Sequence, residues 1–157
     1  MCTSLVLHQG GCYFGRNLDL EYSFGEQVVM TPRRFPLHFH RLPALKHHFS
    51  MIGMANVTEG YPLYAEAVNE KGLYMAGLNF PGNAHYFAAP KVGALNLAPY
   101  ELFPLVLGQC ATVAEARQLL EQVHLVAEPF GPGYPLAPLH WHIAGPDGVL
   151  AAGPVGG

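Results

Sequence analysis

The stretch from Met1 to Asp19, MCTSLVLHQGGCYFGRNLD, decides how the start of this chain folds. Two short apolar runs, Thr3 to His8 and Cys12 to Asp19, flank the pair Gly10-Gly11. Two consecutive glycines accept positive φ at little steric cost, which favours a two-residue primed turn between antiparallel strands. The stretch therefore predicts a β-hairpin at the N-terminus.

A two-residue turn also predicts which residues face each other across the hairpin. It places Cys2 directly opposite Asp19, and cross-strand partners share one face with their Cβ atoms within about 5.5 Å. A carboxylate would then lie beside the N-terminal residue. Arg16 falls on the other face of an ideal ladder and joins Cys2 only through a bulge, for which Gly15 is a suitable position.

The chemistry of Cys2 depends on whether Met1 is removed. Without Met1, the cysteine carries a thiol and a free α-amino group. An α-amine titrates at roughly 7.7–8.0 and can act as a base near neutrality, beside a thiol whose ordinary pKa is about 8.5. Nucleophile and base then belong to one residue, as in an N-terminal nucleophile. Position alone favours the plainer alternative, a cysteine that happens to come second.

Composition restricts the class of protein. The 157 residues suit a single domain, and 50% of them are hydrophobic while 12% are charged. The net charge of −3, without a basic run, gives no electrostatic support for nucleic-acid binding. No apolar stretch approaches the roughly 18 residues of a membrane span, and no signal peptide is evident. Three scattered cysteines make no disulfide framework, so we expect a reducing cytoplasm.

The rest of the chain predicts an α+β fold of mostly antiparallel strands with one or two late helices. Apolar runs and turn signals predict strands at 27–31, 49–56, 63–69, 73–79 and 139–144. Asn69 to Gly72 is typical of a hairpin turn. Thr112 to Glu115 is a capping-box pattern that begins an apolar helical stripe running to Val123, and a second helix, kinked near Pro104, is expected over 100–109. The segments 32–48 and 128–138 are expected to be loops.

The histidines suggest a metal site that the ligand count does not support. A stable site needs three or four converging ligands, and no cysteine or carboxylate stands at matching spacing near any histidine pair. We therefore expect no bound metal. The pairs are His38/His40, His47/His48 and His140/His142.

Three polar residues near the expected Cys2 face are candidates for catalysis. Arg16 could favour the thiolate by its charge, and Asp19 could orient the α-amine. Asn79 closes a predicted strand, where it either ends the strand before a turn or donates a hydrogen bond to an oxyanion. A strand end with polar residues facing solvent is the plain alternative for Arg16 and Asp19.

Several motifs together resemble the choloylglycine hydrolase family, which comprises bile-salt hydrolases and penicillin V acylases. The similarity runs from residue 1 to about residue 144. It implies the four-layer αββα sandwich of N-terminal nucleophile hydrolases. The motifs, in chain order, are Met1 to Thr3, Tyr13 to Phe24, Thr31 to Arg33, Asn69 to Leu73, Ala76 to Pro81 and Leu139 to Ile143.

The resemblance implies a site without a cofactor. Cys2 would be the nucleophile, Arg16 and Asp19 would contact it, and Asn79 would belong to the oxyanion hole. The implied substrate is the amide of a glycine- or taurine-conjugated bile salt, since Leu78 to Pro81 is more similar to the bile-salt hydrolases. Penicillin V and acyl-homoserine lactones are the alternatives. Apolar walls for a steroid are expected from Leu18, Phe24, Tyr61 and Phe130, each of which could equally be a packing residue.

The chain differs from the family in its length. Family members are much longer, and their second half supplies another oxyanion-hole Asn, another Arg and much of the second sheet. We therefore expect residues 1–157 to be a single, truncated domain with an atypical tail at 145–157, and to be inactive or nearly so without the second half. The full-length relatives are expected to be active and to form homo-oligomers. The alternatives are an inactive remnant and a small His-rich binding module.

Overall fold

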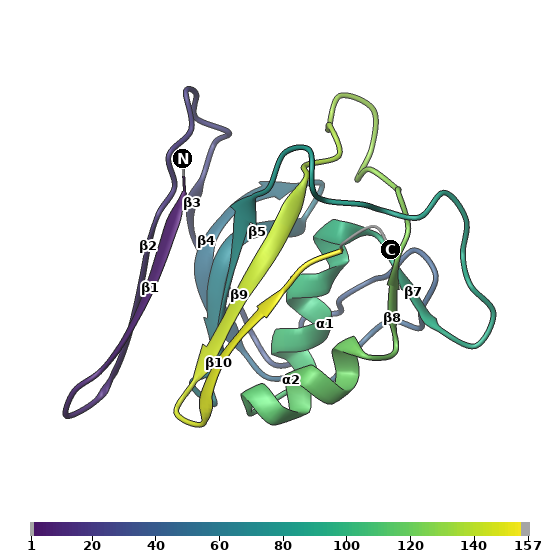
Figure 1. The fold of residues 1–157 in the computed structure, drawn as a ribbon. Coiled ribbons are helices and arrows are strands. Elements are labelled where there is room, and N and C mark those ends of the chain that lie inside the picture. Colours follow the sequence, from purple (N-terminus) through teal and green to yellow (C-terminus); the bar gives the residue numbers. More distant parts are fainter. Residues whose placement is uncertain (1, 155–157) are drawn as a thin grey trace.

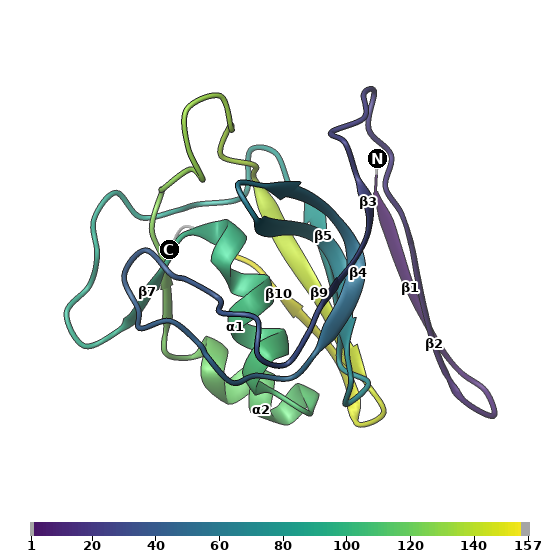
Figure 2. The ribbon, with the colours of Figure 1, turned by 180° about the vertical axis from the view of Figure 1, so that it is seen from behind.

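The computed structural model describes residues 2–154 and arranges them in three layers (Figure 1). The middle layer is a six-stranded sheet in which every neighbouring pair is antiparallel. Two helices cover one face of this sheet, and a separate two-stranded hairpin lies against the other face (Figures 1 and 2). The arrangement confirms the predicted α+β class with mostly antiparallel strands and late helices.

The strands follow a simple order across the layers. The hairpin consists of β1 (Thr3–His8) and β2 (Cys12–Asn17). The central sheet has the order β10-β9-β6-β5-β4-β3, made of β3 (Gln27–Thr31), β4 (Met51–Thr58), β5 (Tyr61–Asn69), β6 (Tyr74–Asn79), β9 (Leu139–Gly145) and β10 (Gly148–Ala152). The remaining elements are the parallel pair β7 (Leu95–Leu97) and β8 (Val123–Leu125), the 3-10 turn η1 (Pro99–Glu101), and the helices α1 (Leu102–Gln109) and α2 (Val113–Leu120).

The connection between β1 and β2 is longer than predicted. His8 pairs with Cys12, so three residues, Gln9 to Gly11, join the strands where two were expected. Gly10 takes a φ of 68°, and the Gln9 amide donates to the Gly11 carbonyl oxygen. A glycine pair accepts either turn length, so local sequence does not select between them.

The added turn residue shifts the register by one and changes what faces Cys2. Pairing continues without interruption to Thr3 opposite Asn17, which places Cys2 opposite Leu18. The predicted pairing of Cys2 with Asp19 is therefore wrong. A one-residue shift also moves side chains to the other face of the strand, so Arg16 shares the face of Cys2 without any bulge.

Strand β6 is buried on both faces, which explains its unbroken apolar run. Met75 faces the helices, where it joins Trp141 of β9 and Phe103 of α1 in the main core. Tyr74 faces the hairpin and stacks on Phe14 with ring centroids 4.9 Å apart. The hairpin therefore packs through one apolar face of its strands against the outer face of the central sheet.

Identifiable side chains explain how each helix begins. Thr112 is the N-cap of α2, and its hydroxyl accepts a hydrogen bond from the Glu115 amide at 3.2 Å, as the capping pattern predicts. The Asp147 carboxylate accepts from the Val113 amide at 3.0 Å, so the β9–β10 turn holds the same helix end. Pro104 lies in the first turn of α1, where a proline does not kink a helix.

The C-terminal part differs from expectation in two respects. Residues 148–152, expected to belong to an atypical tail, form the edge strand β10 and pair with β9. The predicted helical stripe also ends earlier, at Leu120, because Val123 begins β8. Both differences arise where a neighbouring strand offers backbone partners.

Asn69 joins the β5–β6 turn to the end of α1. Its side chain is buried, with 4% of its surface exposed. The side-chain Nδ2 donates to the carbonyl oxygens of Leu107 and Cys110 at 2.9 and 2.7 Å. Its Oδ1 accepts from the amides of Lys71 and Leu73. The predicted turn at 69–72 is confirmed, with Gly72 at a φ of 84°.

Replacing Asn69 by alanine is expected to lower the free energy of unfolding by about 3 kcal/mol, because buried backbone groups lose their partners. Chemical denaturation of the chain measures this. The matched control is Asn83→Ala, since Asn83 is exposed and donates one side-chain hydrogen bond, to the Pro81 carbonyl oxygen. Equal stability losses in the two variants would contradict the structural role of Asn69.

The hairpin register can be tested by cross-linking. Directly opposed residues have Cα atoms about 4.5–5.5 Å apart, within the span that a disulfide bridges. The Leu18→Cys variant is expected to form a disulfide with Cys2 on mild oxidation, whereas Asp19→Cys is not. Mass analysis of unreduced proteolytic fragments distinguishes the two. Cross-linking in Asp19→Cys but not in Leu18→Cys would contradict this register and support the two-residue turn.

Candidate active site

A cavity of about 440 Å³ lies where the hairpin meets the ends of β5 and β6. It draws its walls from the hairpin, from the central sheet, from α1 and from the loop before β9. Residues that carry polar or reactive groups stand beside apolar ones. Among its lining residues are Cys2, Arg16, Leu18, Leu63, Asn79 and Leu136.

Cys2 lines this cavity from the edge of the hairpin. Its side chain is half-buried and packs against the apolar cluster on the outer face of β6, which contains Ala76 and Leu78. Its thiol forms no disulfide. The packing holds Cys2 at the cavity wall while leaving part of the residue exposed.

Arg16 stands in the same wall, two residue pairs along the hairpin from Cys2. Its Nη1 donates to the Ala65 carbonyl oxygen of β5 at 3.0 Å, and its Nε donates to the Asn17 carbonyl oxygen. Its Nη2 is buried and has no hydrogen-bond partner among the described residues. A buried donor without an acceptor is costly, so this nitrogen is suited to an anionic or carbonyl oxygen inside the cavity.

Two further polar residues were expected at the site. Asn79, the last residue of β6, lines the cavity. Asp19 is exposed and is not among the cavity's lining residues. The structure thus brings Cys2, Arg16 and Asn79 to one cavity and places the Asp19 side chain outside its lining. The catalytic roles of these residues stay predictions.

The four residues expected to form the substrate wall lie in three places: the main cavity, an adjoining cavity, and outside both. Leu18 and Phe24 line the cavity with Cys2. Phe130 lines an adjoining cavity of about 150 Å³ that shares several walls with the first. Tyr61 packs against Phe130, with ring centroids 5.7 Å apart, and lines neither cavity. Burial raises the pKa of Tyr61, which keeps its hydroxyl protonated.

Several wall residues carry no signal in the sequence. The loop 128–138 supplies apolar walls to both cavities, and its proline content predicts a loop without indicating where the loop lies. Phe103 reaches both cavities from α1, where its position resembles that of any core residue. Only the tertiary structure brings them together. The wall residues that sequence reasoning missed include Leu63, Tyr64, Phe103, Pro135 and Leu139.

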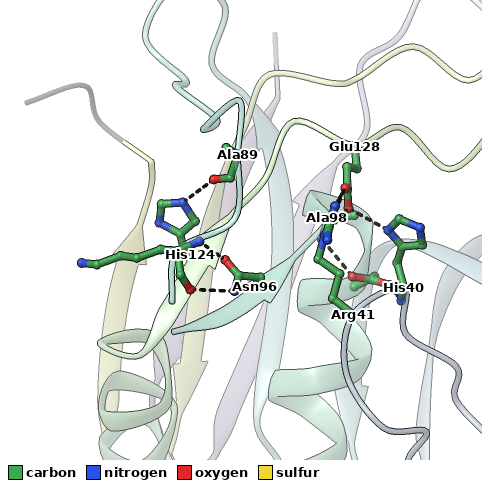
Figure 3. Close-up of polar contacts among 9 residues, drawn as sticks. His40, Arg41, Ala89, Asn96, Ala98, His124 and Glu128 are labelled. Carbon is green, nitrogen blue, oxygen red and sulfur yellow. Dashed lines mark hydrogen bonds and ion pairs between the residues drawn. The ribbon is translucent and has the colours of Figure 1, made fainter. Parts of the chain in front are cut away.

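An ion-pair cluster anchors the loop that forms these walls (Figure 3). The Glu128 carboxylate lies 2.9 Å from His40 Nδ1 and accepts from Arg41 Nε at 3.1 Å. The hydrogen bond from Arg41 is the largest cause that lowers the pKa of Glu128 below its usual value. Nearby, His124 Nε2 lies 3.1 Å from the Ala89 carbonyl oxygen. The start of the 128–138 loop is therefore held to the 32–48 loop.

In residues 2–154, no three His, Cys, Asp or Glu side chains gather closely enough to hold a metal ion. Over the same residues, neither helix has the length and apolar character needed to cross a membrane.

The arrangement is suited to acyl transfer. It places the Cys2 thiol, the Arg16 guanidinium with one unpaired N–H group, and the Asn79 side-chain amide in one partly apolar cavity. A nucleophile attacking a carbonyl needs a hydrogen-bond donor for the oxygen that becomes negative. The apolar walls suit a substrate that is largely hydrocarbon.

Solved structures share this fold. The chain superposes on an arginine-to-leucine variant of conjugated bile acid hydrolase from Clostridium perfringens with a TM-score of 0.91 and 30% identity, over 99% of this chain and 48% of that one. A penicillin V acylase from Agrobacterium tumefaciens matches with a TM-score of 0.69 at 17% identity, over 92% of this chain and 43% of that one, which shows the fold alone. The three layers thus correspond to the N-terminal part of the αββα sandwich.

Curated relatives match over most of this chain. A bile salt hydrolase/transferase of Lactiplantibacillus plantarum is 45% identical over 92% of the chain, and a conjugated bile acid hydrolase of Lactobacillus gasseri is 42% identical over 96%. These matches cover 44% and 48% of the two relatives, so the chain spans about half their length. The family model of linear amide C–N hydrolases, choloylglycine hydrolase family, matches residues 2–149. This chain belongs to the choloylglycine hydrolase family.

Proposed function

We propose that this protein hydrolyses the amide bond of glycine- or taurine-conjugated bile salts, with Cys2 as the nucleophile. The observation that carries the proposal is the cavity that Cys2 shares with Arg16 and Asn79. Its apolar walls, which include Leu18 and Phe24, offer a surface to a steroid. The names of the relatives, bile salt hydrolase and conjugated bile acid hydrolase, support this substrate class.

The proposed reaction proceeds through a thioester. Once Met1 is removed, the α-amine of Cys2 takes the thiol proton, and the thiolate attacks the amide carbonyl carbon. The carbonyl oxygen becomes negative and receives a hydrogen bond from Asn79. The C–N bond then breaks, the amine returns its proton to the leaving nitrogen, and glycine or taurine departs. Water, deprotonated by the same amine, hydrolyses the thioester and frees the bile acid and Cys2.

The neighbouring side chains support these steps in different ways. The Arg16 guanidinium is held by the Ala65 carbonyl oxygen and keeps Nη2 available for the thiolate or the substrate carbonyl. We propose that Asp19 orients the α-amine from outside the cavity lining. Phe130 would extend the apolar surface through the adjoining cavity, and the Tyr61 ring packs against Phe130 from outside that lining.

The first test asks whether Cys2 becomes acylated. Because Cys2, Arg16 and Asn79 share a cavity within the 157-residue chain, we propose, in contrast to the expectation from the sequence, that this chain releases glycine from glycocholate. Acid-quenched samples are expected to show a cholyl thioester on the N-terminal peptide. Cys2→Ala should abolish both signals because it removes the proposed nucleophile. N-terminal mass analysis establishes that Met1 has been removed. Penicillin V, assayed in parallel, separates the two substrate classes.

Two results would contradict this proposal. One is glycine release by Cys2→Ala at the rate of the unmodified chain. The other is the absence of both glycine and thioester in a folded chain that lacks Met1.

The second test concerns Asn79. If its amide stabilises the oxyanion, Asn79→Ala is expected to reduce kcat about 10²–10³-fold with little change in KM. Asn83→Ala is the matched control, since Asn83 lies four residues on, outside the cavity lining. A change confined to KM would assign Asn79 to substrate binding instead.

A further inference from the structure

A hydrogen bond between Ser4 and His142 ties the hairpin to the central sheet. Ser4 Oγ of β1 lies 2.6 Å from His142 Nδ1 of β9. Ser4 pairs directly with Arg16 across the hairpin, and Arg16 is itself bonded to the Ala65 carbonyl oxygen of β5. One rung of the hairpin is therefore attached to the sheet through both of its strands.

This rung is the nearest one to Cys2 on the same face. Residues two apart on a strand share a face and lie about 7 Å apart. Cys2 is therefore the direct neighbour of Ser4 on the inward face. Cys2 is half-buried against the same outer face of the sheet. The position of Cys2 relative to the cavity therefore depends on how firmly Ser4 is held.

Titratable side chains stand on the strands around His142. Arg16 stands on β2 and His140 on β9 itself. On β6, the Tyr74 hydroxyl donates to Glu66 of β5 at 3.1 Å and is also hydrogen-bonded to the Ser4 side chain. Burial is the main cause that raises the pKa of Tyr74 to about 12, so the phenol stays protonated. Strand β10, which pairs with β9 at Ala151, carries no titratable side chain.

Protonation of His142 opposes this packing. Burial is the largest cause that lowers the pKa of His142 from its usual value, and the neighbouring His140 adds to it. A histidine whose pKa is lower in the packed state favours that state when neutral. Neutral His142 therefore stabilises the packed hairpin fully above the ordinary histidine pKa of about 6.5, and this stabilisation is lost as the pH falls.

We propose that His142 is a positioning residue: through Ser4 it holds the hairpin, and with it Cys2, against the sheet, and in acid it releases the hairpin. The inference rests on the proposed function only in taking Cys2 as the nucleophile. Acid would then separate Cys2 from Asn79, which belongs to the central sheet.

The test measures how fast Cys2 is alkylated by iodoacetamide between pH 8 and pH 5. Fragment-ion masses of the N-terminal peptide separate labelling of Cys2 from labelling of Cys12, the other free cysteine in that peptide. The reference is His142→Asn, whose amide oxygen can still accept from Ser4 but does not titrate. The ratio of the two rates cancels the ionisation of the thiol. We expect a ratio near one at pH 8, rising about fivefold at pH 5, because burial disfavours the charged imidazole in the packed state.

Three further variants test the role of Ser4 and the specificity of the pH effect. Ser4→Ala is expected to label about fivefold faster than the unmodified chain already at pH 8, and Ser4→Thr, which retains the hydroxyl, is expected to restore the slow rate. His38→Asn, at an exposed loop position, should keep the pH profile of the unmodified chain. Thermal unfolding of each variant confirms that it is folded.

The outcomes separate this inference from the proposed function, because labelling needs no substrate. A rate ratio that stays near one from pH 8 to pH 5 overturns the inference, as does Ser4→Ala labelling at the unmodified rate. If labelling follows the expectation while no bile salt is hydrolysed, the positioning role stands and the proposed function fails.

Discussion

The site depends on the packing of one face of the β1–β2 hairpin against the outer face of the central sheet. Val6 and Phe14 contact the apolar side chains of β6, and Phe14 stacks on Tyr74. Because side chains alternate along a strand, the residues that share this face with Val6 and Phe14 must also point inward. Cys2 and Arg16 are two of them. Hydrophobic burial at the middle of the hairpin therefore determines the direction of the reactive groups at its end.

The same packing explains why a charged residue is tolerated at the cavity. Burying a guanidinium is unfavourable unless its nitrogens find acceptors. The carbonyl oxygens of Ala65 and Asn17 satisfy two of them, and the third is left unpaired among the described residues. An unpaired buried donor is a feature that proteins retain where a ligand or substrate supplies the acceptor. Arg16 thus connects the architecture of the two sheets to the proposed chemistry.

Local signals in the sequence predicted most elements correctly. Thr112 caps its helix, the 69–72 turn forms where Gly72 allows a positive φ, and strands appear at all the predicted places. The failures share a cause. Gly10-Gly11 accepts more than one turn length, and residues 148–152 become a strand because β9 offers them backbone partners. In each case the deciding contacts are made with another strand, β6 for the hairpin and β9 for residues 148–152.

The sequence by itself determined the fold class, the family and the residues that could carry the chemistry, because these depend on local patterns and on motifs in a fixed order. The tertiary structure alone decided which of those residues meet. It placed Arg16 on the face of Cys2, left Asp19 outside the cavity lining, and brought the 128–138 loop to the cavity. The physical reason is that strand register and loop placement follow from side-chain packing between segments far apart in the chain. Local propensity does not depend on that packing and so cannot predict it.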